Sequence, residues 1–256
     1  MKKIRYIKSN CQNRRRIFYR RLMMRFIILV FAFTILFPAC ATSKADSHKD
    51  KSVRTVEIKD NSTIVCFGDS LTYGHGADSA TESWPALLQK RVRIPVINSG
   101  RNDDTTADGL LRFDADVLSH NPAVVILDFG GNDLFYPKKR LSRKQIETNF
   151  RTMLDRLDLS TTQIYIMRFY NNQMRFLDLF GRFDRMLKRL EKDYGVTIIW
   201  DAWSGAWGHK DCKFDMTHCN AKGYKIMEEN IFNVLEPFLK ENDLLIKNGN
   251  DSCKTN

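Results

Sequence analysis

The sequence predicts an α/β fold in which a parallel sheet lies between layers of helices. Short runs of β-branched and aromatic residues alternate along the chain with segments of helical periodicity. The runs are Ser62–Phe67, Ile94–Asn98, Ala123–Phe129, Gln163–Phe169 and Val196–Trp200. Three of them are apolar almost throughout, which is typical of strands covered on both faces. Strict alternation of strand and helix requires right-handed crossovers, so we expect parallel strands with helices on both sides.

The segments between these runs carry the signals of helices. Ser142 and Gln145 form a capping-box pattern ahead of an apolar face. Apolar residues at helical spacing also follow Trp84 and Leu110, and Asn220 is placed to cap the last helix. The two remaining helices are expected at Leu177–Leu190 and Lys222–Leu239.

Composition and charge restrict the classes of function. The 256 residues include 41 Lys+Arg against 30 Asp+Glu, a formal net charge of +11. Ten of the basic residues and no acidic residue lie in residues 1–40, which leaves 31 basic against 30 acidic residues in 41–256. A uniformly basic surface is therefore excluded, and we expect no nucleic-acid partner. With 43% hydrophobic and 11% aromatic residues the chain can fill a core, and the length after residue 40 suits one domain.

Residues 1–40 have the organisation of an export signal. Basic residues precede Phe26–Phe37, an uncharged apolar run too short to span a bilayer comfortably as a helix, and the small residue Ala39 stands directly before Cys40. This ending resembles a bacterial lipoprotein signal, in which the cysteine becomes the lipidated first residue. An uncleaved N-terminal anchor is the alternative. In either case we expect an exported protein, as a membrane-anchored lipoprotein or in the periplasm or outside the cell.

The rest of the chain divides into three predicted parts. Residues 41–61 are polar and rich in Lys, Asp and Ser, which predicts a flexible tether. Residues 62–240 contain all the expected strands and helices and form the predicted domain. Residues 241–256 are expected to be a polar C-terminal tail.

Reactive side chains follow the predicted strands, at the sheet edge where ligands bind in folds of this class. Ser70 stands at a strand-to-helix turn, which presents its hydroxyl at the rim of the sheet. Asn132 follows two glycines and offers an amide donor. Asp215 lies three residues before His218, so its carboxylate can fold back onto the imidazole within one turn. The four segments are Gly68-Asp69-Ser70-Leu71, the loop Asn98–Thr106, Gly130-Gly131-Asn132-Asp133 and the loop Asp215–His218.

These four segments resemble the sequence blocks of the SGNH (GDSL) hydrolase superfamily. The stretches Ser83–Leu88 and Asp104–Thr106 point to its bacterial thioesterase/lysophospholipase/arylesterase branch. The resemblance covers residues 62–239, with the blocks in the familiar order. It implies a three-layer α/β/α, flavodoxin-like fold with a five-stranded parallel sheet, and hydrolysis of acyl esters without a metal or other cofactor.

The resemblance also implies roles for individual residues. Ser70 is the nucleophile, His218 the general base and Asp215 the group that orients the imidazole. The oxyanion hole consists of the Ser70 N–H, the Asn132 side-chain amide and a backbone N–H of the second block.

Asp103 is a departure from the family pattern, which usually has glycine directly before Asp-Thr-Thr. Its N–H can still donate to an oxyanion, and Asp tolerates a positive φ better than most residues. An inward carboxylate would oppose the developing negative charge, so we expect the side chain to point to solvent. Gly100 is the alternative donor in the same loop.

Two further groups of residues leave alternatives open. Cys212 and Cys219 flank the Asp215 loop and are equally compatible with a disulfide, which persists outside the cytoplasm, and with two free thiols. Aromatic residues at the strand ends are candidates for an acyl pocket, although such residues more often only pack. They are Phe135, Tyr136, Phe169, Tyr170, Trp203 and Trp207.

Three functions are compatible with these observations. The first is a serine esterase that hydrolyses lysophospholipids, simple esters or thioesters through an acyl-enzyme. The second is a polysaccharide or cell-wall O-deacetylase that uses the same site, and the third is a lipid-anchored binding protein whose hydrolysis is weakened by Asp103. The first two, enzymatic, functions are favoured over binding alone, because the chain retains Ser70, Asn132, Asp215 and His218. The expected partners are a small acyl-ester or lipid substrate and, through the N-terminal anchor, a membrane.

Overall fold

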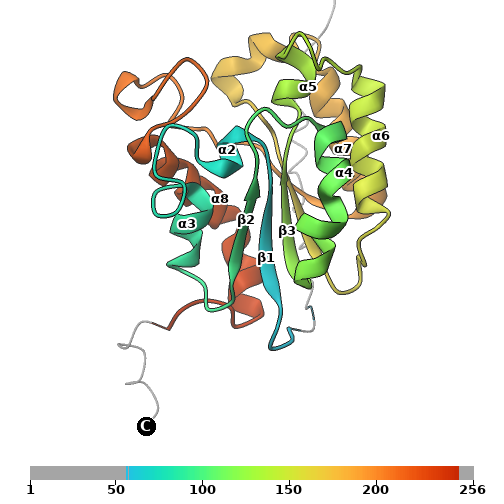
Figure 1. Ribbon diagram of the computed structural model, residues 1–256, viewed down its shortest axis with the longest axis vertical. Coiled ribbons are helices and arrows are strands. Elements are labelled where there is room, and N and C mark those ends of the chain that lie inside the picture. The colour runs from blue at the N-terminus through green and yellow to red at the C-terminus, as the bar shows by residue number, and fades with distance from the viewer. Residues whose placement is uncertain (1–55, 57, 248–256) are drawn as a thin grey trace, which may run out of the picture. The chain divides into compact units, whose positions relative to one another are not determined.

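Five parallel strands form the centre of the computed structural model, which describes residues 56 and 58–247 (Figure 1). Their order across the sheet is β2-β1-β3-β4-β5. The strands are β1 (Thr63–Gly68), β2 (Val96–Gly100), β3 (Pro122–Asp128), β4 (Gln163–Met167) and β5 (Thr197–Ile199). The predicted α/β class, with a five-stranded parallel sheet, is thereby confirmed, and each strand lies within three residues of its expected bounds.

Helices cover both faces of this sheet. The helices α3 and α8 pack on one face, and α4, α6 and α7 pack on the other (Figure 1). The α-helices are α2 (Ser70–Tyr73), α3 (Trp84–Gln89), α4 (Thr106–Asp116), α5 (Gly131–Phe135), α6 (Arg143–Leu154), α7 (Arg182–Tyr194) and α8 (Ala221–Glu241). The 3₁₀ helices are η1 (Leu118–His120), η2 (Asn172–Asp178) and η3 (Lys210–Cys212).

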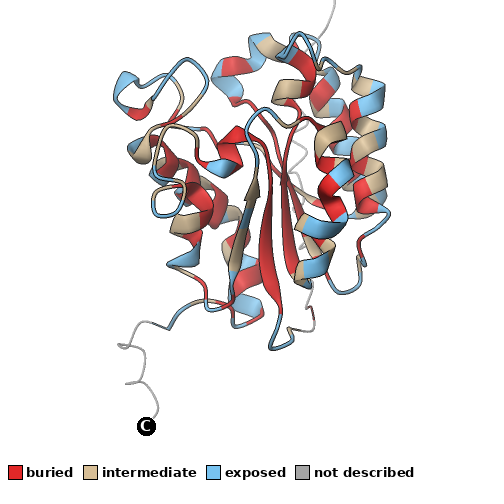
Figure 2. Cartoon of the chain, viewed as in Figure 1, coloured by how far each residue is buried: buried red, intermediate tan, exposed pale blue. Residues whose placement is uncertain are grey.

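The core consists of two apolar layers, one on each side of the sheet. Alternate residues of β1 point to opposite faces, so that Ile64 and Cys66 join the layer under α3 and α8 while Val65 and Phe67 join the other. All six residues of β1 are buried, and Figure 2 shows the central strands as the most continuously buried part of the domain. This explains why the sequences of the three inner strands, β1, β3 and β4, are apolar almost throughout.

The caps of the helices follow the sequence signals in most places. Ser142 and Gln145 form the predicted reciprocal cap of α6, and the Asn220 side chain accepts a hydrogen bond from the Gly223 N–H at the start of α8. The helix predicted over Leu177–Leu190 is wrong at its N-terminal end, because the chain there forms η2 and then starts α7 at Arg182.

Asp178 and Gly181 cause this break. Gly181 adopts a left-handed conformation with φ of 57°, which ends regular helix geometry. The buried Asp178 carboxylate then accepts hydrogen bonds from the N–H groups of Arg182 and Phe183 at 3.0 and 2.8 Å. A carboxylate that binds the free N–H groups of a first turn makes a helix start favourable there.

The termini of the domain reach beyond the predicted helices. Val56, within the predicted tether, is buried and donates its N–H to Asn242. Beyond α8, Leu244 is fully buried, and its carbonyl accepts a hydrogen bond from the Arg93 N–H. The predicted signal at residues 1–40, with Cys40, lies outside the described residues, and the proposed domain boundaries stay predictions. Within the described part of the chain, no helix is both long and apolar enough to cross a membrane.

Candidate active site

Ser70 begins the short helix α2 directly beyond β1. A Cβ at Gly68 would lie 2.7 Å from the Asp128 carbonyl, so only glycine fits the end of this strand. The Asp69 carboxylate caps α2 by accepting the Leu71 N–H at 3.0 Å. These two residues hold the strand-to-helix turn that presents Ser70, which is largely buried at 8% exposure.

His218 reaches Ser70 from the loop between β5 and α8. The His218 Nε2 lies 2.9 Å from the Ser70 Oγ, and its Nδ1 lies 2.8 Å from the Asp215 Oδ2. The other carboxylate oxygen of Asp215 accepts the N–H groups of Thr217 and His218, both at 2.7 Å. The structure thus aligns a hydroxyl, an imidazole and a carboxylate, which is the geometry of a catalytic triad.

The hydrogen bonds at Asp215 also set its charge. Partial burial opposes ionisation, but the bonds from His218 and Thr217 outweigh it and hold the pKa of Asp215 at about 2. Asp215 is therefore a carboxylate at neutral pH and can stabilise a positive charge on His218. The structure brings the three residues together as the sequence predicted, whereas their catalytic roles stay a prediction.

His75 lies beside this cluster and was not predicted from the sequence to be part of it. Its ring centroid is 4.5 Å from that of His218. Among the described residues, His75, Asp215 and His218 place possible metal-binding atoms within 4.8 Å of one another. The His218 nitrogens already contact Ser70 and Asp215, so a metal ion here would compete with the hydrogen bonds of the triad.

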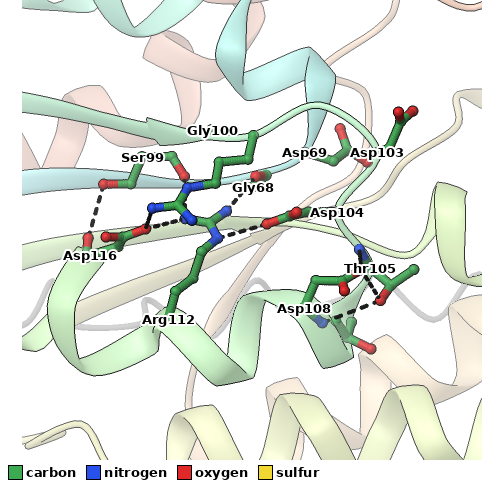
Figure 3. Close-up of polar contacts among 12 residues, drawn as sticks. Gly68, Asp69, Ser99, Gly100, Asp103, Asp104, Thr105, Asp108, Arg112 and Asp116 are labelled. Atoms are coloured by element: carbon green, nitrogen blue, oxygen red, sulfur yellow. Dashed lines mark hydrogen bonds and ion pairs between the residues drawn. The ribbon is translucent and has the colours of Figure 1, made fainter.

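Arg112 of α4 fastens the loop that follows β2 to the turn before Ser70 (Figure 3). Its guanidinium donates to the Gly68 and Ser99 carbonyls at 3.0 and 2.9 Å, and pairs with Asp104 at 2.6 Å and Asp116 at 2.7 Å. The side chain is 9% exposed. A planar guanidinium with five fixed donors is suited to holding several acceptors in one plane. No local sequence motif surrounds Arg112, so its role could not be predicted from the sequence.

The segment that runs from the end of β2 to α4 carries two candidate oxyanion donors, the N–H groups of Asp103 and Gly100. The Gly100 N–H donates to the Asn98 side chain at 3.0 Å, so the structure does not support Gly100 as the alternative donor. Asp103 adopts a positive φ of 64° and is exposed, and among the described residues no acceptor meets its N–H. Lys139 binds the Asp103 carbonyl at 3.1 Å and so holds the outer end of the loop.

Asn132 stands at the start of α5 and connects the segments of the site. Its side-chain amide donates to the Asp104 carbonyl at 2.9 Å and more weakly to Asp69 at 3.4 Å. The next residue, Asp133, is buried and accepts the Thr106 N–H at 3.0 Å, which ties the third block to the start of α4. Donation from Asn132 to an oxyanion would replace the longer contact to Asp69.

Two buried carboxyls lie beneath the serine turn. Burial raises the pKa of Asp128 to about 6, although a hydrogen bond from Thr72 at 2.8 Å opposes the rise. Burial also raises the pKa of Asp69 well above its ordinary range, and the charge of Asp128 adds to that rise. Both residues are buried, and a negative charge on Asp128 disfavours ionisation of Asp69.

A cavity of about 380 Å³ opens next to Ser70 and Asn132. Its walls are mainly apolar and come from α5, η2 and the loop after β5. Five of the six candidate aromatic residues line it, namely Phe135, Tyr136, Phe169, Trp203 and Trp207. Tyr170 does not, because its ring is buried and its hydroxyl donates to Asp178 and Asp184. The cavity also includes Met174, Phe176 and Met216, which the sequence analysis did not name.

Cys212 and Cys219 are buried free thiols in the structure, so no disulfide closes the loop that carries Asp215. Burial raises the pKa of Cys219 to about 12, which keeps this thiol neutral. The loop is held instead by Asn220, whose side-chain amide donates to the Asp211 carbonyl at 3.0 Å.

Comparison with known proteins agrees with this geometry. Residues 66–226 match the GDSL-like Lipase/Acylhydrolase family. The chain belongs to that family. It is therefore a carboxylic ester hydrolase of the GDSL type, as the resemblance of the four blocks predicted.

Individual relatives of this GDSL hydrolase are more distant. Esterase TesA of Pseudomonas aeruginosa is 26% identical over 185 residues, which cover 69% of this chain and 89% of the relative. The "Thioesterase 1/protease 1/lysophospholipase L1" of Escherichia coli is 28% identical over 54% of this chain and 65% of its own length. A crystal structure of TesA superposes with a TM-score of 0.60 at 23% identity, over 69% of this chain and 99% of that one. The structural likeness supports the fold.

We predict that Arg112→Ala lowers the turnover number for a soluble ester at least about tenfold, because the loop that carries Asp103 loses its attachment to Gly68. It should also lower the free energy of unfolding by about 3 kcal/mol, since Asp104 and Asp116 lose a partly buried partner. Arg112→Lys keeps the positive charge but loses the planar guanidinium. Its turnover number and free energy of unfolding should therefore lie between those of Arg112→Ala and the unmodified protein. Steady-state kinetics and urea unfolding measure both effects.

Arg156→Ala is the matched control, because Arg156 pairs with Asp114 at the surface. That variant should retain turnover and stability almost unchanged. If Arg112→Ala were folded and kept the turnover number of the unmodified enzyme, the positioning role of Arg112 would be refuted.

Asp128 predicts a dependence of stability on pH. In the unfolded chain its pKa is about 3.9, so between pH 4 and 6 the folded protein keeps a proton that the unfolded chain releases. The stability of the unmodified protein should therefore fall as the pH rises through this window. Asp128→Asn removes this loss. The free energy of unfolding of the variant, relative to that of the unmodified protein, should therefore be about 2 kcal/mol more favourable at pH 7.5 than at pH 4.5. Urea unfolding at the two pH values tests this, with exposed Asp193→Asn as the control, and a pH-independent difference would contradict it.

Proposed function

We propose that this protein is a serine esterase that hydrolyses acyl esters through a Ser70–His218–Asp215 triad and an acyl-enzyme intermediate. The observation that carries the proposal is the pair of hydrogen bonds at His218, 2.9 Å to the Ser70 hydroxyl and 2.8 Å to the Asp215 carboxylate. A serine hydroxyl is a weak nucleophile at its ordinary pKa, so a base within hydrogen-bond distance is what its attack requires.

Proton movement in the proposed reaction follows from these contacts. As the Ser70 oxygen attacks the ester carbonyl, its proton passes to the His218 Nε2, and the resulting imidazolium is stabilised by Asp215. His218 then donates that proton to the leaving alcohol or thiol as the C–O or C–S bond breaks. A water molecule then attacks the acyl-enzyme and gives its proton to His218, which returns that proton to the Ser70 Oγ as the bond between Oγ and the acyl carbon breaks and the acid leaves.

Candidate donors for the oxyanion lie on three segments, which the fold brings together. The Ser70 N–H and the Asp103 N–H have no acceptor among the described residues, and Asn132 is the third candidate. Because the Asp103 side chain is exposed, its carboxylate does not oppose the charge on the oxyanion at close range. Such donors contribute most where they are held before the reaction begins, as Arg112 and Lys139 hold this loop.

The cavity beside Ser70 favours an acyl lipid or another ester with an apolar acyl chain. Its aromatic and aliphatic walls bury apolar surface, at about 0.8 kcal/mol for each methylene group that leaves water. An O-deacetylase would need only a small pocket for acetate, together with polar groups for a sugar. Two relatives, one named an esterase and the other a lysophospholipase among its activities, support an ester and an acyl lipid as substrates.

We also propose that the protein acts on the exported side of a membrane, anchored at Cys40. The support is the sequence of residues 1–40, with its basic segment, its apolar run and a cysteine after a small residue. An anchor at this position would keep the domain near lipid substrates.

Ser70→Ala should lower ester hydrolysis by about a thousandfold or more, because the hydroxyl that forms the acyl-enzyme is lost. His218→Ala should have a similar effect, and Asp215→Asn a smaller one. Hydrolysis of p-nitrophenyl esters of increasing chain length measures these effects and the chain-length preference. Ser79→Ala, a serine outside the site, is the control. If Ser70→Ala kept full activity, the proposed nucleophile would be wrong. If the unmodified protein cleaved only acetate esters, the proposed substrate class would be wrong.

Cys40→Ser should move the protein from the membrane fraction to the soluble exported fraction, because the thiol that would carry the lipid is gone. Mass spectrometry of the N-terminal peptide should show a lipid mass on Cys40 in the unmodified protein and none in the variant. Cys253→Ser is the control. Retention of Cys40→Ser in the membrane fraction would instead support an uncleaved anchor.

A further inference from the structure

Three large apolar side chains stand in water where the chain passes from η2 to α7. Phe176, Leu179 and Phe180 are 64%, 78% and 72% exposed. Single exposed apolar residues are common in soluble proteins, but three within five residues form a patch of the kind that marks an interaction site. Phe176 also lines the cavity beside Ser70, so the patch is continuous with the proposed substrate site.

A basic cavity of about 750 Å³ lies between the N-terminal ends of α6 and α7. Six basic residues line it, namely Arg140, Arg143, Lys144, Arg182, Arg185 and Arg189. Glu147 also lines it, but this carboxylate is already paired with Arg151 and Arg189. Among the described residues, Arg140, Lys144, Arg182 and Arg185 have no acidic partner, so the cavity carries a net positive charge.

Phe180 joins the apolar patch to the basic cavity. Arg185 donates a hydrogen bond to the Phe180 carbonyl at 2.7 Å, and the Arg182 guanidinium lies 5.5 Å from the centre of the Phe180 ring. Both arginines line the cavity. The apolar patch and the basic cavity are therefore neighbouring parts of one surface, which runs from the substrate cavity past η2 to the ends of α6 and α7. We call it the η2 surface.

We propose that the η2 surface docks on an anionic phospholipid bilayer. Leu179 and Phe180 enter the interface between headgroups and acyl chains, where their apolar surface leaves water. The unpaired basic side chains bind lipid phosphates, which arginine meets with two parallel hydrogen bonds. A soluble anion would neutralise the charge of the basic cavity but would leave the apolar patch in water. An anionic bilayer would neutralise the charge and also bury the patch.

Docking in this way would also direct the substrate. Phe176 belongs both to the patch and to the wall of the cavity beside Ser70, so the opening of the cavity lies next to the bilayer surface. An acyl chain of a lipid can then pass from the bilayer towards Ser70 with little exposure to water. This consequence rests on the proposed esterase function, whereas docking itself does not.

Hydrogen–deuterium exchange of the full-length protein tests docking without any measurement of activity. The protein is mixed with vesicles of phosphatidylcholine alone, or of phosphatidylcholine with an equal amount of phosphatidylglycerol. Peptides that cover residues 138–146 and 172–185 should exchange several-fold more slowly with the anionic vesicles, and the protection should fall as salt is raised. Peptides that cover 106–116, with the exposed Leu111, should not change.

Variants separate the apolar and the basic contributions. The double variant Leu179→Glu/Phe180→Glu should lose the protection, whereas Leu111→Glu, at a residue that is 89% exposed, should keep it. Lys144→Glu/Arg185→Glu should also lose it, while Lys192→Glu/Lys225→Glu, with the same change of charge elsewhere, should not. Leu179→Glu/Phe180→Glu should also reduce hydrolysis of a lysophospholipid in anionic vesicles about tenfold relative to p-nitrophenyl acetate.

Several results would overturn the proposal. They are unchanged exchange of residues 172–185 with anionic vesicles, equal protection by neutral vesicles, and equal protection by dextran sulfate in the absence of vesicles. The last result would assign the surface to a soluble polyanion. Failure of the unmodified protein to cleave any ester would instead refute the esterase function and leave the exchange result standing.

Discussion

The parallel register of the adjacent strands β2, β1 and β3 is the constraint on which the site depends. Gly68 of β1 pairs with Gly100 of β2 on one side and with Asp128 of β3 on the other, so the three strands end in one row. The chain beyond each strand must therefore leave the sheet at the same edge. This is why the serine turn, the loop that carries Asp103 and the turn that carries Asn132 meet, although some sixty residues separate the first from the last. His218 reaches the same edge from the loop before α8.

Polar side chains near this edge are buried, and each therefore needs a partner. Arg112 offsets the loss of water by binding two carbonyls and two carboxylates, and Asp133 binds Thr106. Buried polar networks of this kind are rigid because breaking any one contact leaves an unsatisfied group in a medium of low polarity. Rigidity of this kind suits an oxyanion hole, whose donors must be in place before negative charge develops. Burial near this edge also has a cost. It raises the pKa values of Asp69 and Asp128, because the charged form of a carboxyl is less stable away from water.

The proposed substrate site of this hydrolase is built from segments outside the sheet. η2, α5 and the loop after β5 supply the apolar walls of the cavity, and η2 also carries the exposed patch that leads to the basic cavity. One short segment thus contributes to both the proposed acyl site and the proposed docking surface. Such segments can vary without disturbing the serine turn, because β1 and the contacts of Gly68, Asp69 and Arg112 hold that turn.

The sequence by itself determined the fold class, the order of strands and helices, and the three residues of the proposed triad, because local periodicity and short motifs encode them. It also indicated that Asp103 would accept an unusual backbone conformation, and the structure has φ of 64° there. Only the tertiary structure decided that the Gly100 N–H is occupied, that Cys212 and Cys219 stay free thiols, and that a helix starts at Arg182 instead of Leu177. Arg112, His75 and the η2 surface were likewise invisible in the sequence. Their contacts join residues that are distant along the chain, and no local pattern records which distant groups the packing of a sheet will bring within reach.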